Sequence, residues 1–172
     1  MNIELRPLSV DDGADIYEML QDIPNGENGF VNRMNGESYE VFREWLVRQV
    51  RSSQSINLID GWLVPQNTYW LYADGRPVGI GRIRHYLTDA LRQAGGNIGY
   101  AVRKSERGKG YGNKLLSLLL AECRKRNMDR VLITVRNHNA ASIRVALKNG
   151  GVIDHKNDIR HFIWIDLKED TK

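Results

Sequence analysis

The stretch Ile98–Asn113, IGYAVRKSERGKGYGN, decides which fold this sequence adopts. An apolar run that ends at Val102 predicts a strand, and the basic turn 107–112, RGKGYG, leads directly into a long helical segment. Three glycines in this turn let a ligand approach the backbone without meeting Cβ atoms. The first amides of a helix lack intrahelical acceptors and lie at the positive end of its dipole. The segment therefore predicts an anion site that suits a diphosphate.

The turn matches neither of two common nucleotide-binding patterns. The P-loop pattern G-x-x-x-x-G-K-[ST] needs a Lys-Ser/Thr pair, which this turn does not contain. The dinucleotide pattern G-x-G-x-x-G is absent as well, because Gly108, Gly110 and Gly112 alternate. On these residues alone, a tight strand-to-helix turn without a ligand is the alternative.

Charge is distributed unevenly along the chain. The first 60 residues carry 11 acidic and 5 basic side chains, whereas residues 103–148 carry 12 basic and 3 acidic ones. The basic segment contains the glycine turn, and this asymmetry favours an anionic ligand there. A solvated helix face is the alternative explanation for these charges. The acidic first third favours the attraction of a cationic substrate.

Composition is typical of one ordinary globular domain. The chain has 172 residues, 41% of them apolar, and no repeat or Pro/Ser-rich linker divides it, so we expect a single domain over 1–172. No apolar run reaches the roughly 18 residues of a membrane span, and we expect neither a signal peptide nor a membrane partner. A single cysteine, Cys123, excludes an internal disulfide and suits a reducing, cytoplasmic location.

Hydrophobic periodicity around the glycine turn predicts alternating helices and strands. The expected helices are 10–21, 38–51, 110–125 and 139–149, and the expected strands are 3–6, 68–72, 77–86, 97–102, 131–135, 151–156 and 159–167. Asp74-Gly75 predicts a tight hairpin, and Ser38 and Asn139 are expected helix caps. This order indicates a mixed α/β domain with helices on the faces of its sheet.

Two segments together resemble the GNAT superfamily of N-acetyltransferases. RGKGYG at 107–112, after the strand IGYAV, is similar to the superfamily's Q/R-x-x-G-x-G/A pyrophosphate motif, and 139–151 resembles its Asn-capped helix that ends at Lys-x-Gly. The stretches 68–71, 84–85 and 95–100 resemble a bacterial branch of predicted acetyltransferases. The resemblance implies a single-domain GNAT fold, with a mixed, mostly antiparallel sheet of about seven strands, helices on both faces and a splayed central strand pair.

The resemblance implies that an acetyl group passes from acetyl-coenzyme A, the co-substrate, to a primary amine by direct attack in a ternary complex, without a metal. Pantetheine would lie in the splay beside Tyr100, Ala101 and Val102, where a backbone N–H would face the developing oxyanion. Asn139 and Ser142 would lie beside the coenzyme's arm. The diphosphate would lie on Arg107, Gly108, Lys109, Gly110, Tyr111, Gly112 and Asn113.

The usual proton-transfer residues of the superfamily are missing at two positions. Ala146 stands where many members carry a tyrosine that donates a proton to the thiolate. Asn97 stands where a glutamate that acts as general base is common. Three candidates replace them: Asn97 as the holder of a relay water, His85 as the base, and Ser142 as the donor to the thiolate. Each has a structural alternative in hydrogen bonding or packing. The Tyr100 hydroxyl is a donor only if it turns into the cleft.

Other functions share parts of this pattern. A coenzyme-A-binding module that regulates or scaffolds without turnover would keep the glycine turn. Nucleic-acid binding is disfavoured, because the net charge of +4 is modest and no aromatic residues interleave with the basic ones of 103–148 in an RNA-binding pattern. The acceptor is a small-molecule or peptide amine that the sequence does not specify, with Trp62 and Trp70 as candidates to line its pocket or the core. A homodimer is compatible with the resemblance.

Overall fold

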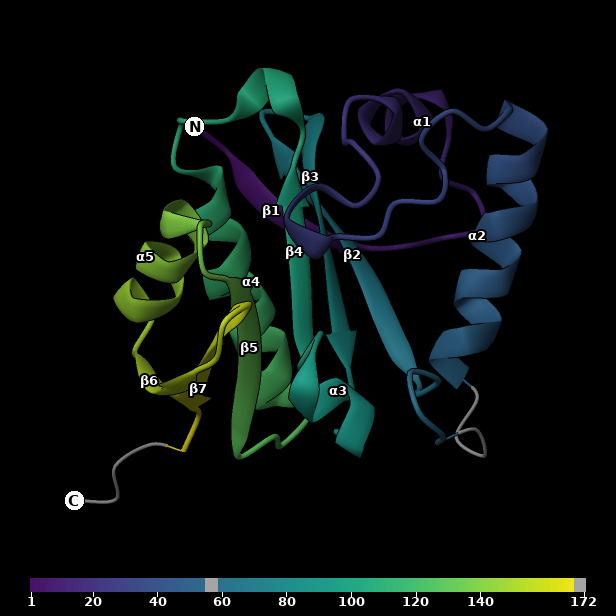
Figure 1. Cartoon of the computed structure of the whole chain (residues 1–172). Helices are drawn as coiled ribbons and strands as arrows, with labels where there is room; N and C mark the ends of the chain where they lie inside the picture. The colour runs from purple at the N-terminus through teal and green to yellow at the C-terminus, as the bar shows by residue number, and fades with distance from the viewer. Residues whose placement is uncertain (55–58, 169–172) are drawn as a thin grey trace.

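The computed structural model describes residues 1–54 and 59–168, so part of the long connection before the second strand lies outside it. The elements follow the expected order, with one additional short helix (Figure 1). The strands are β1 Ile3–Pro7, β2 Gln66–Ala73, β3 Arg76–Arg84, β4 Ile98–Val102, β5 Arg130–Arg136, β6 Gly151–Lys156 and β7 Arg160–Asp166. The helices are α1 Ala14–Gln21, α2 Tyr39–Gln54, α3 Asp89–Gln93, α4 Tyr111–Lys125 and α5 Ala140–Lys148, with 3-10 turns η1 Glu27–Gly29 and η2 Lys104–Glu106.

The strands form two sheets, with strand orders β1-β2-β3-β4 and β5-β7-β6. Every pairing within them is antiparallel, which confirms the expected mixed α/β class and antiparallel strands. Within the described residues no ladder joins β4 to β5, so the sheet is divided there, as the resemblance implied. None of the helices in the described ranges is long and apolar enough to cross a bilayer.

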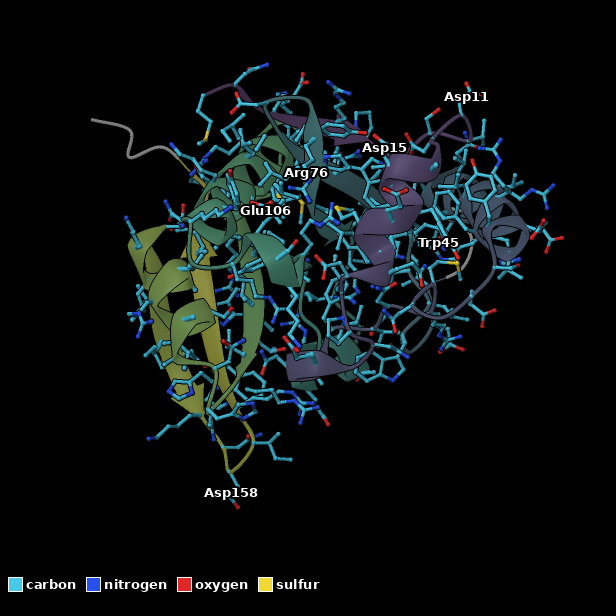
Figure 2. The ribbon with its side chains drawn as sticks, turned by 90° about the horizontal axis from the view of Figure 1, so that it is seen from above. Asp11, Asp15, Trp45, Arg76, Glu106 and Asp158 are labelled. Atoms are coloured by element: carbon cyan, nitrogen blue, oxygen red, sulfur yellow. The ribbon has the colours of Figure 1, made fainter. Side chains whose placement is uncertain are left out.

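Helices cover both faces of the β1–β4 sheet, as expected. On one face α4 lies close to β3, because a Cβ at Gly81 would come within 2.6 Å of Leu119. On the other face α1 and α2 pack around Trp70, which is fully buried and donates an indole hydrogen bond to Asp12 at 2.7 Å. Figure 2, seen from above, shows α1 on one side of this sheet and α4 and α5 on the other. Trp70 is therefore a core residue.

The local chemistry explains where elements begin. Ser38 Oγ accepts from Val41 N at 3.2 Å and Asn139 Oδ1 accepts from Ser142 N at 3.3 Å, which confirms both expected caps. The hairpin at Asp74-Gly75 has φ values of 49° and 78°, typical of a tight two-residue turn. The first helix begins at Ala14 rather than near Val10, because the Asp12 carboxylate accepts from Ser9 N and holds a turn there.

Helix α3 was not expected from the sequence. Its cap is Thr88, whose Oγ1 accepts from Leu91 N at 3.3 Å, and Leu91 is fully buried. At five residues it is too short for a helical hydrophobic period to be visible, so only the cap and one buried leucine mark it. This helix leads the chain back to the start of β4.

Candidate active site

The gap between β4 and β5 is closed at one end by Asn97. Its backbone N–H donates to Leu132 O at 2.8 Å, and its side-chain oxygen accepts from Leu132 N at 2.9 Å. Its side-chain nitrogen donates to Arg84 O at 3.1 Å, so this buried amide joins three strands. Gly96 has a φ of +59° and lies so close to β5 that a Cβ would come 2.3 Å from Leu132 O. Beyond this contact, β4 and β5 separate.

The separated part of β4 presents its backbone to the gap. Arg103 N donates to Val78 O on the β3 side at 2.9 Å, and Asn97 O accepts from Arg84 N at 2.7 Å. Successive backbone groups of a strand point to opposite edges, so the N–H groups of Tyr100 and Val102 face β5. An exposed strand edge of this kind can pair with an extended ligand.

The glycine turn follows this open edge. Gly108 and Gly110 have φ values of +78° and +83°, and no atom lies within 4 Å of a Cβ built on either. No acceptor among the described residues takes a backbone N–H from residues 108–113, and the first helical bond of α4 is from Lys114 N to Gly110 O. Six consecutive amides, in the turn and the first residues of α4, therefore have no acceptor within the described chain, which suits an anion.

A cavity of about 1190 Å³ connects the turn with the open strand edge. It exceeds the roughly 300–1,000 Å³ usual for a small-ligand pocket, so it has room for two reactants. Every residue expected to contact the coenzyme lines it except Lys109. The Lys109 ammonium instead pairs with the buried Glu106 at 2.7 Å, and Glu106 also binds Arg76, beside which it lies in Figure 2. The Arg107 guanidinium pairs with Glu27 and donates to Val102 O at 3.1 Å.

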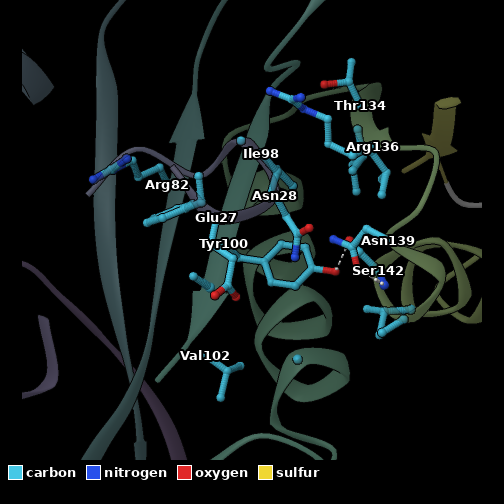
Figure 3. A pocket seen from close by; sticks show the side chains of 18 of the residues that line it. Glu27, Asn28, Arg82, Ile98, Tyr100, Val102, Thr134, Arg136, Asn139 and Ser142 are labelled. Carbon is cyan, nitrogen blue, oxygen red and sulfur yellow. Dashed lines mark hydrogen bonds between the residues drawn. The ribbon is translucent and has the colours of Figure 1, made fainter. Parts of the chain in front are cut away.

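Two expected site residues meet across the gap. Tyr100 Oη on β4 and Ser142 Oγ in the first turn of α5 lie 3.0 Å apart, as the dashed line in Figure 3 marks. Burial raises the pKa of the Tyr100 hydroxyl, although the hydrogen bond with Ser142 opposes this. Tyr100 is therefore protonated at neutral pH, with its hydroxyl turned toward the cavity that both residues line.

Asn97 and His85 lie elsewhere. Neither belongs to the described residues that line the cavity. His85 follows the end of β3, where a ring nitrogen lies 2.6 Å from Asn67 Oδ1. Burial, with a smaller contribution from Arg126, lowers the pKa of His85. Because the Asn97 amide is bonded to two backbones, neither the relay role of Asn97 nor the base role of His85 gains support from these positions.

Of the two tryptophans named as candidates for the pocket, Trp62, 58% exposed, lines the cavity. The cavity also has components that sequence patterns did not identify. The 3-10 turn η1 contributes Glu27 and Asn28, which lie in front of β4 (Figure 3). Arginines from β3, β5 and β7 form a further wall. Among residues 1–54 and 59–168, no group of three or more His, Cys, Asp or Glu side chains is placed to hold a metal ion.

Comparison with known proteins gives one family and many similar folds. A family model described as an acetyltransferase (GNAT) domain matches residues 2–152. Among curated proteins, none matches the sequence at a significant level.

Three solved structures illustrate the similarity in fold. A putative acetyltransferase of Salmonella typhimurium, yncA, with acetyl-CoA, is 18% identical, with 99% of this chain and 96% of that chain covered and a TM-score of 0.63. The Campylobacter jejuni N-acetyltransferase PseH, in complex with acetyl coenzyme A, is 10% identical, with 97% and 100% covered and a TM-score of 0.62. RimL, a ribosomal L7/L12 alpha-N-protein acetyltransferase in complex with coenzyme A, is 16% identical, with 98% and 97% covered and a TM-score of 0.68.

Proposed function

This chain belongs to the GNAT acetyltransferase family, and from that premise we propose that it transfers an acetyl group from acetyl-coenzyme A to the nitrogen of an amine. The observation that carries the proposal is the open edge of β4 leading into six amides without a protein acceptor at residues 108–113. Two structures of similar fold hold acetyl-CoA, which supports the same co-substrate here.

The backbone of the turn supplies most of the proposed coenzyme site. Its amides and the α4 dipole would hold the diphosphate, with Gly108 and Gly110 giving the phosphate oxygens room. The Arg107 side chain is already paired with Glu27, so we assign its contribution to the backbone. The edge of β4 from Tyr100 to Val102 would lie along the pantetheine arm and the thioester, with the Val102 N–H left for the thioester oxygen. Bound in this way, acetyl-coenzyme A supplies an activated thioester at the open strand edge.

The residues around the gap suit direct transfer. In the reaction a C–N bond forms, the C–S bond breaks, and the nitrogen loses a proton. The Val102 N–H would stabilise negative charge on the thioester oxygen, since fixed donors of this kind are typically worth about 10²–10³ in rate. Only roughly 0.04% of a lysine-like amine is neutral at pH 7. The described lining contains no histidine, and its two carboxylates are paired, so we assign the nitrogen's proton to water.

We assign protonation of the leaving thiolate to Tyr100, supported by Ser142. The tyrosine hydroxyl is protonated at neutral pH, lies in the cavity lining and has a serine partner at 3.0 Å. It comes from β4 rather than from α5, where Ala146 replaces the tyrosine of many relatives. A thiol with a pKa near 8.5 leaves readily, so the donor accelerates the reaction without being indispensable.

Calorimetric titration with acetyl-coenzyme A, followed by thiol release with a panel of amines, tests the proposed function. We expect saturable binding and amine-dependent release of coenzyme A. Absence of acetyl-coenzyme A binding by the folded protein would contradict the proposal. Binding without turnover on any amine would reduce the protein to a coenzyme-binding module.

Replacing Tyr100 with phenylalanine should lower kcat by about 10- to 100-fold, because the proton donor to the thiolate is lost. The affinity for acetyl-coenzyme A should be unchanged, since the ring and the backbone edge remain. Tyr69→Phe is the matched control, because it also removes a hydrogen-bonded hydroxyl. The Tyr69 hydroxyl accepts from Arg126 at 3.3 Å, and Tyr69 lies outside the cavity lining. Steady-state kinetics and titration measure both quantities. An equal loss in kcat in the two variants would refute the assignment.

A further inference from the structure

One wall of the cavity is built from arginines. They come from a loop, β3, β5 and β7, and they are Arg33, Arg82, Arg84, Arg136 and Arg160. Figure 3 shows Arg82 and Arg136 on either side of the β4 residue Ile98. Residues up to 127 positions apart in the sequence thus bring the same charge to one cavity.

The four wall arginines that belong to strands lie on the opposite face of the sheets from the glycine turn. On β3, Gly79 and Gly81 face α4, so the alternation of the strand turns Arg82 to the other face. On β5, Val135 packs in the core beneath α4, so Arg136 also faces away from α4. Arg160 lies directly opposite Arg136 in the β5–β7 ladder and shares its face. The diphosphate cradle at the start of α4 therefore does not use this wall.

Arg82 is the most constrained of the five. Arg82 is only 9% exposed, and its Nε has no hydrogen-bond partner among the described residues. Nη1 donates to Val31 O at 2.7 Å, and the guanidinium lies 4.7 Å from the Phe30 ring centroid. Burial, with the positive charges of Arg84 and Arg33, lowers the pKa of Arg82 to about 10. A buried charge and an unsatisfied donor are both unfavourable in free energy. An anion bound to this guanidinium would reduce both costs.

No carboxylate of the described chain neutralises the wall. The acidic residues that line the cavity are Glu27 and Glu106, and their partners are Arg107, Arg76 and Lys109. Within the described ranges none of the five wall arginines forms an ion pair with a carboxylate. The wall also has the opposite charge from the one that the acidic first third led us to expect for a cationic substrate. The described chain therefore leaves this wall without a carboxylate partner, which suits an anionic ligand.

We propose that the acceptor amine carries an anionic oxyacid group, a carboxylate or a phosphate, which the arginine wall binds while the nitrogen faces the thioester. The guanidinium fork matches the geometry of both groups, and it forms charge-assisted hydrogen bonds with them. The cavity is lined on one side by the turn and on the other by the arginines, so the two reactants meet at the gap between β4 and β5. This inference deepens the proposed function and rests on it.

Four small amines of similar size test the charge preference: β-alanine, O-phosphoethanolamine, n-propylamine and 1,3-diaminopropane. Thiol release from acetyl-coenzyme A gives kcat/KM for each. We expect at least one of the two acidic amines to exceed both others by about 10- to 100-fold, as hydrogen bonds to charged groups imply. The ratio of the carboxylate to the phosphate substrate identifies which oxyacid the site takes. A neutral or cationic amine as good as the best acidic one would overturn the inference while leaving acetyl transfer intact.

Arg136→Gln tests the wall itself, because Arg136 is only half-buried and Arg82, which supports a loop, is a riskier choice for folding. We expect kcat/KM for the preferred acidic amine to fall by about 10- to 100-fold, a loss at least several-fold larger than the one for n-propylamine. Arg130→Gln is the matched control, since Arg130 lies on the same strand and face but outside the cavity lining. Equal losses in the two variants would overturn the inference.

A binding measurement keeps this test independent of turnover. Each acidic amine is titrated calorimetrically into the protein saturated with coenzyme A. We expect wild-type and Arg130→Gln protein to bind the preferred amine, and Arg136→Gln protein to bind it about 10- to 100-fold more weakly. Failure of the wild type to bind either acidic amine would overturn the anion site. Failure to release thiol with any amine, in protein that binds both ligands, would instead contradict the proposed function.

Discussion

Gly110→Asp removes acetyl-coenzyme A binding, with an expected loss of affinity of at least about 100-fold. Gly110 has a φ of +83° and open space around its Cβ position, so an aspartate side chain fits without a clash. Its carboxylate, however, projects from the turn whose amides are proposed to hold the diphosphate, and like charges repel in that site. Calorimetric titration with acetyl-coenzyme A measures the loss.

Gly36→Asp is the control for this variant. Gly36 has a φ of +86° and open space around its Cβ position, and it does not line the cavity. Both variants therefore place an aspartate in the same strained backbone conformation, but only one places it at the turn. Similar coenzyme affinities in the two folded variants would remove the turn from the binding site.

Gly96→Ala lowers the free energy of unfolding by at least about 2 kcal/mol, since overpacking against a fixed backbone adds to the strain of a positive φ. The new methyl group would lie 2.3 Å from Leu132 O, and that carbonyl is held by the hydrogen bond from Asn97 N. The backbone at the closed end of the gap between β4 and β5 must therefore move. Urea unfolding measures the change.

Gly150→Ala is the control for Gly96→Ala, because it has the strain of a positive φ without the steric clash. Gly150 also has a positive φ, +90°, but nothing lies within 4 Å of its Cβ position. This control should lose only the roughly 1–2 kcal/mol of a left-handed alanine. If both variants unfolded at the same urea concentration, the close contact between Gly96 and β5 would have no energetic significance.

Local chemistry made most of the fold predictable. The caps Ser38 and Asn139 and the Asp74-Gly75 hairpin act within a few residues, and the structure has each of them where the sequence predicted it. Helix α3 was missed because a single turn capped by Thr88 shows no helical period. The division of the sheet at β4 came from the family resemblance alone, since strand pairing is set by non-local contacts that no single segment specifies.

The candidate site was predictable only where it is continuous in sequence. The turn and the β4 edge lie within residues 98–113, so one pattern marked both. Lys109 was included because of its charge, but the buried Glu106 competes for its ammonium. The arginine wall was missed because its members come from four separate segments. Only Arg82 and Arg84, two residues apart on a strand with small or apolar neighbours, gave a local sign of it.

The interrupted sheet leaves strand edges on which a bound ligand could add to the stability of the fold. Among the described residues, the contact at Asn97 is the only backbone pairing between the facing edges of β4 and β5, and side chains of both sheets share one hydrophobic core. A pantetheine arm bound along β4 would fill the gap between β4 and β5. By mass action, a ligand at 100 times its Kd adds about 2.7 kcal/mol to folding stability. Saturation with acetyl-coenzyme A would then raise the free energy of unfolding by that amount, which a thermal or urea unfolding series with added ligand measures.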